Sequence, residues 1–131
     1  MRVDGAATGL LAGLADKVIA KALAAMHREV ARGWTVDALA SLCGVSRSTF
    51  AVRFRNVVGM APIDYLLQWR MALAKDALSR GVNSVGAIAF SIGFQSSSAF
   101  TTAFTRADGC SPRRFARQMA QVASPPQQQP D

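Results

Sequence analysis

Arginine and small hydroxyl side chains, gathered on two short segments, are the groups in this sequence best suited to do chemistry. One segment spans residues 46–58 and the other spans residues 96–107. Arginine binds phosphate oxygens through its guanidinium group, and small hydroxyl or apolar side chains contact the edges of bases. These residue types indicate recognition of a nucleic acid. The side chains expected to face bases are Arg47, Ser48, Ala51, Val52, Ser97, Ser98, Thr101 and Thr102, and those expected to contact phosphate are Arg53, Arg55, Arg106 and Arg113.

The sequence has too few suitable residues for a metal site or a catalytic site. The sequence has two cysteines, Cys43 and Cys110, and one histidine, His27, whereas structural zinc usually takes four such ligands at close spacing. Neither a carboxylate pair nor a serine, histidine and aspartate arrangement suggests catalysis. We therefore expect no enzyme activity, no metal and no cofactor. We expect Cys43 to be a buried small side chain and Cys110 a loop residue, in a reducing intracellular compartment.

The charge of the chain favours a polyanionic partner. Lys and Arg number 15 against 8 Asp and Glu, so that the net charge is +7, which is typical of proteins that bind nucleic acid. No segment approaches the roughly 18 consecutive apolar residues of a membrane span. The amino-terminal residues also lack a convincing signal peptide. We expect a cytoplasmic protein with no membrane partner.

Two parts of the chain carry the same pattern. Residues 35–62 align with residues 84–112 when one inserted residue is allowed. The matching pairs are Thr35 with Ser84, Val36 with Val85, Leu39 with Ile88, Ala40 with Ala89, Gly44 with Gly93, Phe50 with Phe100, Phe54 with Phe104, Gly59 with Gly109 and Pro62 with Pro112. Each copy predicts a short helix opened by a hydroxyl cap, a tight turn around a glycine, and a second helix opened by Ser46 or Ser96. The repeat therefore predicts two helix-turn-helix units.

The second helix of each copy has one apolar face. A helix turns about 100° per residue, which places Phe50 and Phe54 together in the first copy. Phe100 and Phe104 take the same positions in the second copy. We expect these phenylalanines to be buried. The residues expected to face bases then lie on the opposite, outward side.

A long helix over residues 61–80 joins the two copies. Pro62 suits its start, and Gly81 suits its end. Two apolar stripes are expected to pack against the two units, one with Ile63, Leu67, Met71, Ala74 and Leu78, the other with Leu66, Trp69, Leu73 and Ala77. Roughly 19 helical residues are about 28 Å long, and successive major grooves on one face of B-DNA lie roughly 34 Å apart. The two second helices are thus expected to enter adjacent major grooves.

The predicted fold class is all-α, with about seven helices. The predicted boundaries are a flexible lead-in over 1–9, a first helix-turn-helix subdomain over 10–60, the linker helix over 61–81, a second helix-turn-helix subdomain over 82–122 and a disordered tail over 123–131. The first subdomain is expected to open with a helix from Leu10 to about Val30, followed by a buried Trp34. The second is expected to end with a helix from Arg113 to about Val122.

Residues Thr35 to Arg117 resemble the DNA-binding domain of AraC/XylS-type transcription regulators. The run FTRADGCSPRRF, from Phe104 to Phe115, is similar to the signature of that family, and the linker matches its Y-x4-R-x3-A pattern at Tyr65, Arg70 and Ala74. The resemblance implies sequence-specific binding of double-stranded DNA by a transcription regulator associated with the bacterial nucleoid. It also implies RNA polymerase as a partner, and an amino-terminal effector or dimerisation domain that these 131 residues do not contain. The chain is then the carboxy-terminal part of a longer regulator or a stand-alone family member.

Two alternatives belong to other classes. A similar module occurs in DNA-repair proteins with a methyl-accepting cysteine domain, but that chemistry needs a cysteine cluster on zinc, which Cys43 and Cys110 do not supply. A helical protein-interaction module is the second alternative, and a linear fall of log affinity for DNA with log salt would argue against it. Small side chains at the base-facing positions favour thymine methyl contacts, bridging water and DNA shape as the basis of specificity.

Overall fold

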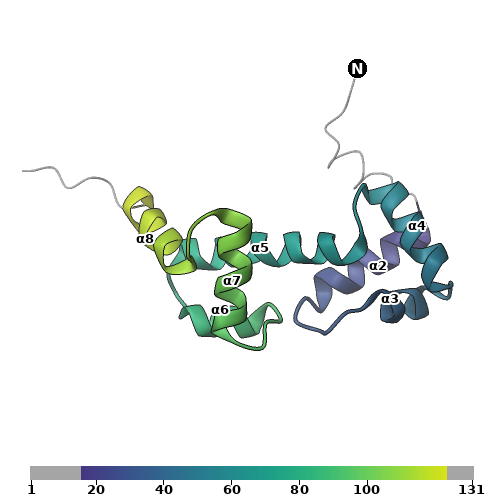
Figure 1. Cartoon of the computed structure of the whole chain (residues 1–131), viewed down its shortest axis with the longest axis horizontal. Helices are drawn as coiled ribbons and strands as arrows, with labels where there is room; N and C mark the ends of the chain where they lie inside the picture. Colours follow the sequence, from purple (N-terminus) through teal and green to yellow (C-terminus); the bar gives the residue numbers. More distant parts are fainter. Residues whose placement is uncertain (1–15, 124–131) are drawn as a thin grey trace, which may run out of the picture. The chain divides into compact units, whose positions relative to one another are not determined.

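The computed structural model describes residues 16–123, and within them the fold is all-α, as predicted (Figure 1). The predicted lead-in over 1–9 and the tail beyond Ala123 lie outside the described residues. No helix in the described part of the chain is long and apolar enough to cross a bilayer. The seven helices of residues 16–123 are α2 (Lys17–Arg28), α3 (Val36–Cys43), α4 (Arg47–Val58), α5 (Pro62–Arg80), α6 (Val85–Ser91), α7 (Ser97–Asp108) and α8 (Pro112–Ala123).

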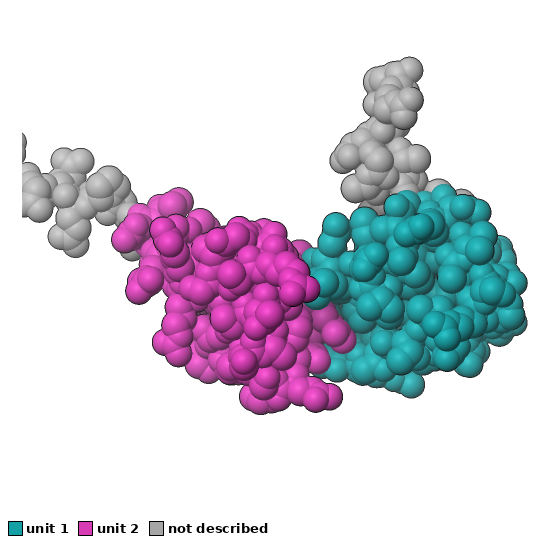
Figure 2. Space-filling model, in the orientation of Figure 1, with its two compact units in different colours: residues 1–69 teal, residues 70–131 magenta. Residues whose placement is uncertain are grey.

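The chain divides into two compact units, residues 1–69 (unit 1) and residues 70–131 (unit 2) (Figure 2). Unit 1 holds α2, α3, α4 and the first part of α5, and unit 2 holds the rest of α5 with α6, α7 and α8. The division falls inside α5, between Trp69 and Arg70, whereas the sequence suggested that the linker helix is a segment of its own. The predicted subdomain boundaries remain a proposal.

Hydroxyl and glycine residues set the helix ends in both copies of the repeat, as predicted. Each hydroxyl cap accepts a hydrogen bond from a backbone N–H three residues later, at Thr35 (3.0 Å), Ser46 (3.2 Å), Ser84 (3.1 Å) and Ser96 (3.0 Å). Such bonds satisfy N–H groups that have no partner inside the helix. Gly44 ends α3 with a φ of 73°. This left-handed conformation disfavours any residue with a Cβ.

The core of unit 1 is built around Phe50 and Phe54 of α4, whose side chains are fully buried. They share this core with Ile19 and Met26 of α2 and with Leu39 of α3, among other residues. Trp34 is buried as well, and its ring N–H donates to the carbonyl of Glu29 at 2.9 Å. The inward orientation of the phenylalanines and the buried Trp34 are both confirmed.

The core of unit 2 repeats this arrangement with Phe100 and Phe104 of α7, which are also fully buried. Ile88 of α6 and Ala74 of α5 belong to the same core. The ring of Phe104 meets that of Phe115 of α8 edge to face, with centroids 5.6 Å apart. One face of α7 is therefore buried in the core of unit 2, and the opposite face is exposed.

The span predicted for the first helix is wrong. Asp16 has an extended backbone (φ −92°, ψ 107°) and caps α2, which begins at Lys17 and ends at Arg28. Asp16 therefore does not lie inside a helix as expected, and α2 ends two residues before Val30. Helical periodicity suggested that Asp16 is a solvated residue inside the helix, but its short carboxylate instead satisfies the N–H groups of the first turn. The part predicted before Asp16 lies outside the described residues.

One of the two stripes predicted on α5 is also wrong at its start. Ile63 and Leu67 were expected to be packed with Met71 and Leu78, but they are 41% and 40% exposed. In this part of α5, Leu66 is the residue that enters the core of unit 1. Met71 and Leu78 are buried in unit 2, as predicted. A stripe of apolar residues is buried only over the length for which a unit covers it.

Candidate nucleic-acid interface

The outward face of α4 is open over its whole length. Arg47, Ser48 and Val52 are exposed, and Ala51 is half-buried. Val52 is 61% exposed, which is high for a large apolar side chain in a folded unit. It lies in a shallow groove of about 460 Å³, lined by Ser48, Thr49, Val52, Arg53, Asn56 and Val57. The face predicted to meet bases is thus accessible, apolar at its centre and polar around it.

The outward face of α7 is polar and uncharged. Ser97, Ser98 and Thr102 are exposed, and Thr101 is half-buried. Arg106, in the last turn of α7, is the basic residue of this helix. Hydroxyl groups both donate and accept hydrogen bonds, so that this face suits base edges and bridging water rather than one particular base.

The four arginines expected to contact phosphate fall into two groups. Arg55, Arg106 and Arg113 are exposed, and they form no ion pair with any other residue that the structure describes. Arg53 is different, because its Nε donates to the Asp16 carboxylate at 2.8 Å. Three of these guanidinium groups are thus available to an outside anion, and the fourth is engaged.

Asp16, which binds Arg53 of α4, is a residue that the sequence did not single out. Its Oδ1 accepts hydrogen bonds from the N–H groups of Val18 (3.0 Å) and Ile19 (3.2 Å), while its Oδ2 accepts the bond from Arg53. The hydrogen bond from Arg53 lowers the pKa of the Asp16 carboxyl group, against the opposing effect of burial. An aspartate at a helix start is a recognisable capping signal. The pairing with Arg53 cannot be recognised in the same way, because Arg53 lies 37 residues away in sequence.

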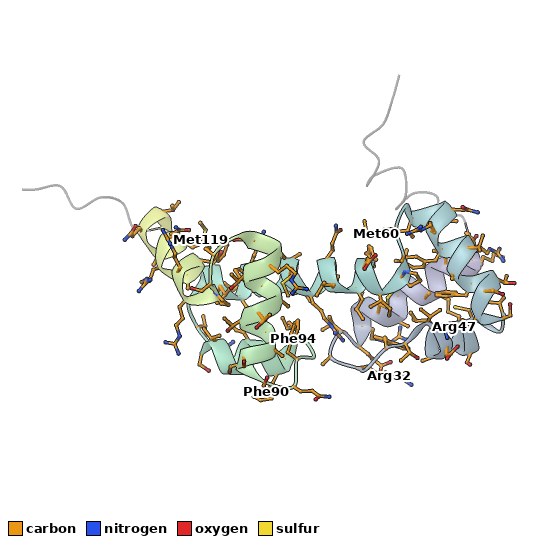
Figure 3. The ribbon with its side chains drawn as sticks, viewed as in Figure 1. Arg32, Arg47, Met60, Phe90, Phe94 and Met119 are labelled. Atoms are coloured by element: carbon orange, nitrogen blue, oxygen red, sulfur yellow. The ribbon has the colours of Figure 1, made fainter. Side chains whose placement is uncertain are left out.

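Arg47, predicted to face bases, also lies near a carboxylate. Figure 3 shows it at the start of α4 beside α3, and its guanidinium is 3.8 Å from the Asp37 carboxylate. The two side chains are 68% and 70% exposed. Water and salt screen a pair of this kind, and it contributes little to holding the arginine in place.

Arg113 lines a cavity of about 430 Å³ in unit 2. Arg117, one turn further along α8, lines the same cavity, as do Asn83 and Ser84 from the chain between α5 and α6. Leu78, Gly81, Val85 and Ala116 complete its lining. Two guanidinium groups beside an amide and a hydroxyl favour an anion. The sequence predicted Arg113, Arg114 and Arg117 as arginines that could contact phosphate near the start of this helix. Only the fold brings Asn83 and Ser84 beside them.

His27 of α2 is half-buried in unit 1, where it contacts residues of α5. It shares a hydrogen bond of 2.7 Å with the Tyr65 hydroxyl, and its ring lies 4.4 Å from that of Trp69. Burial lowers the pKa of His27 and raises that of Tyr65. These contacts tie α2 to α5. Among residues 16–123, His27 belongs to no group of three or more His, Cys, Asp and Glu side chains that could hold a metal ion.

These features define a class of protein with two helix-turn-helix units, each presenting one exposed helix with small polar and basic side chains. A family model described as a helix-turn-helix domain matches residues 39–118. The chain belongs to the AraC-type helix-turn-helix family, as its sequence resemblance implied.

The relatives with known names are transcription regulators. Over 111 residues the chain is 48% identical to a protein of Streptomyces antibioticus described as an AraC-like transcription regulator, covering 85% of this chain and 37% of that protein. Over 108 residues it is 37% identical to the HTH-type transcriptional regulator AlkR of Acinetobacter baylyi, covering 82% of this chain and 35% of AlkR. The chain thus spans just over a third of the length of these relatives.

Solved structures share the fold. The DNA-binding domain of the global transcriptional factor AdpA, determined in complex with a target DNA, superposes with a TM-score of 0.75 at 32% identity, covering 86% of this chain and 99% of that one. A transcriptional regulator from Chromobacterium violaceum with an AraC-type DNA-binding domain superposes with a TM-score of 0.70 at 26% identity, covering 79% of this chain and 93% of that one.

Proposed function

We propose that this chain is the sequence-specific DNA-binding part of a transcription regulator, with α4 and α7 as its two reading helices. The observation that carries the proposal is the division of faces on these helices. Each buries two phenylalanines completely and leaves the opposite face exposed, with small or basic side chains. A helix of this kind fits the width of a major groove. The similarity to the AdpA domain, which was solved with its target DNA, supports the same assignment.

The proposed base contacts come from the outward faces of the two helices. On α4 they are made by Arg47, Ser48, Ala51 and Val52, and on α7 by Ser97, Ser98, Thr101 and Thr102. The exposed methyl groups of Val52 suit the methyl group of thymine, and the hydroxyl groups of α7 suit hydrogen bonds made directly or through water. Specificity then comes from several modest contacts together with the shape of the DNA.

The proposed phosphate contacts come from Arg55, Arg106 and Arg113. None of the three is neutralised by a carboxylate among the described residues. Arg113 acts from the cavity that it shares with Arg117, where a phosphate oxygen meets two guanidinium groups. Arg53, the fourth arginine predicted to contact phosphate, reaches DNA only when it leaves Asp16.

The proposal extends to the setting of the protein. α5 has 19 residues and is about 28 Å long, which suits two reading helices in adjacent major grooves roughly 34 Å apart. The regulator is proposed to work without enzyme activity, in the bacterial cytoplasm at the nucleoid. RNA polymerase and an amino-terminal effector or dimerisation domain are its proposed partners. The second of these is supported by the named relatives, of which the aligned segments make up only 37% and 35%.

The proposal is tested by selecting sites from a random duplex library with the 131-residue chain, followed by anisotropy titrations of selected and scrambled duplexes. We expect a selected site with two elements about one helical turn apart. Val52→Glu and Thr102→Glu should each lose the selected site at unchanged helicity, because a carboxylate is placed against DNA. Val122→Glu is the matched control, since Val122 is 77% exposed on α8, outside both reading helices. Full binding by the Val52 or Thr102 variant would show that the outward face is assigned wrongly.

A further inference from the structure

The contact between Asp16 and Arg53 joins the start of α2 to a reading helix. Arg53 follows Val52 directly on α4 and lines the same groove. Its Nε nevertheless donates to Asp16, at 2.8 Å, rather than pointing its charge freely outward. The Asp16 side chain is 16% exposed and that of Arg53 is 45% exposed. The carboxylate is thus largely enclosed, while the guanidinium that it holds stays within reach of solvent.

The Asp16 carboxylate is held in place from two sides. Two backbone N–H groups of α2 bind one of its oxygens, which leaves the other oxygen aimed at Arg53. An acceptor fixed by a helix start loses little entropy when it binds a cation, unlike two flexible side chains on a surface. Asp37 and Arg47 provide the contrast, with a separation of 3.8 Å and most of both side chains exposed. Of these two arginines of α4, only Arg53 has a preformed partner.

We propose that Asp16 is a positioning residue that sets the DNA specificity of α4 by holding Arg53 as an internal ion pair. This inference rests on the proposed DNA binding and assigns a new role to a residue that touches no base. While Asp16 holds Arg53, the reading helix has one cation fewer for phosphate contact. Phosphate contact adds affinity for every sequence alike. Asp16 therefore lowers binding to unrelated DNA, and it keeps α4 fixed against α2 for the contacts that read bases.

Asp16→Asn is the decisive variant, because asparagine caps a helix about as well as aspartate but lacks the charge. With Arg53 released, we expect the magnitude of the slope of log affinity against log salt to rise by about 0.9. Between about 50 mM and about 200 mM salt, the variant should then lose about 3- to 4-fold more affinity for a scrambled duplex than the unsubstituted protein does. The ratio of affinities for selected and scrambled duplexes should fall.

Three further variants of the full chain test whether the change in salt slope comes from Arg53. Arg53→Gln should leave the salt slope of the natural sequence unchanged, and in the Asp16→Asn background it should remove the gain. Arg55→Ala should reduce the slope by about 0.9, because Arg55 is a free phosphate contact. Asp37→Asn should change the slope much less than Asp16→Asn, because Arg47 is only loosely held. Circular dichroism shows whether each variant is folded.

The outcomes separate this inference from the proposed function. If the natural sequence shows no salt-dependent binding to duplex DNA, the proposed function fails. If it binds DNA but Asp16→Asn leaves both the slope and the affinity ratio unchanged, only the role of Asp16 fails. If Arg53→Gln lowers the slope as much as Arg55→Ala does, Arg53 contacts phosphate in spite of its ion pair, and the role of Asp16 is again overturned. That last comparison needs no substitution at the helix cap.

Discussion

At the level of single residues, the two reading helices carry unequal charge. Arg47, Arg53 and Arg55 lie on α4, whereas Arg106 is the single arginine of α7. Free cations near phosphate raise the affinity for DNA. If the proposed function holds, we therefore expect α4 to supply more of the affinity and α7 to supply discrimination through its hydroxyl groups. Because Asp16 binds Arg53, the difference between α4 and α7 in the number of free arginines is smaller.

The half-buried His27 makes folding stability depend on pH. Burial lowers its pKa in the folded chain below the ordinary value of 6.5, so the unfolded chain binds more protons as the pH falls through that value. The free energy of unfolding should therefore decrease from about pH 7.5 to about pH 5.5. His27→Gln keeps a polar partner for Tyr65 but does not titrate, and it should show a smaller decrease. Thermal unfolding at the two pH values measures this, and equal decreases in both proteins would rule out His27 as the cause.

At the level of elements, the structure depends on caps and turns that recur in both units. Ser46 and Ser96 open the reading helices with equivalent hydrogen bonds. Gly59 and Gly109 end them with left-handed backbone conformations. Each reading helix thus starts and ends at equivalent positions, which fixes its length and the direction of its outward face.

The turn between α3 and α4 should be sensitive to a single methyl group. Gly44 has a φ of 73°, and a Cβ there has no atom within 4 Å, so that any cost comes from the backbone conformation alone. Gly44→Ala should lower the free energy of unfolding by about 1–2 kcal/mol. Gly33→Ala is the control, because Gly33 is not among the glycines with a positive φ and has equal space for a Cβ, and it should be neutral or slightly stabilising. Urea unfolding compares the two, and equal effects would contradict the backbone argument.

At the level of the whole molecule, the chain has one core in each unit. Phe50 and Phe54 centre the first core, and Phe100 and Phe104 centre the second. Each core is small, so each unit by itself has limited stability. Residues of α5 enter both cores, which makes this helix the covalent link between two structural units.

Removing one core phenylalanine should loosen one unit more than the other. Phe100→Ala removes a fully buried ring from unit 2, at a cost of about 3–5 kcal/mol. Hydrogen exchange should then show lost protection in α6 and α7, while α2, α3 and α4 keep most of theirs. Phe50→Ala should give the reverse pattern. Uniform loss of protection in either variant would mean that the two cores unfold together through α5.

Features that depend on nearby residues could be predicted from the amino-acid sequence. Local hydrogen bonding accounts for the hydroxyl caps and the positive-φ glycines, and a helical period of 3.6 residues accounts for the inward phenylalanines. The same pattern occurs in both copies of the repeat, which strengthens each prediction. The fold class, the two helix-turn-helix units and the outward faces of α4 and α7 were therefore predictable. The resemblance at Phe104 to Phe115 supplied the family.

Contacts between residues that are distant in sequence could be found only in the folded chain. Asp16 binds Arg53 across 37 positions, and His27 binds Tyr65 across 38, and neither pairing follows from periodicity or spacing. The burial of Leu66 rather than Ile63 and Leu67 was also decided there, since both stripes of α5 are apolar in sequence. The physical reason is the same in each case. A local pattern fixes which side chains share a helix face, but the packing of other helices decides which part of that face is covered and which partner each charge finds.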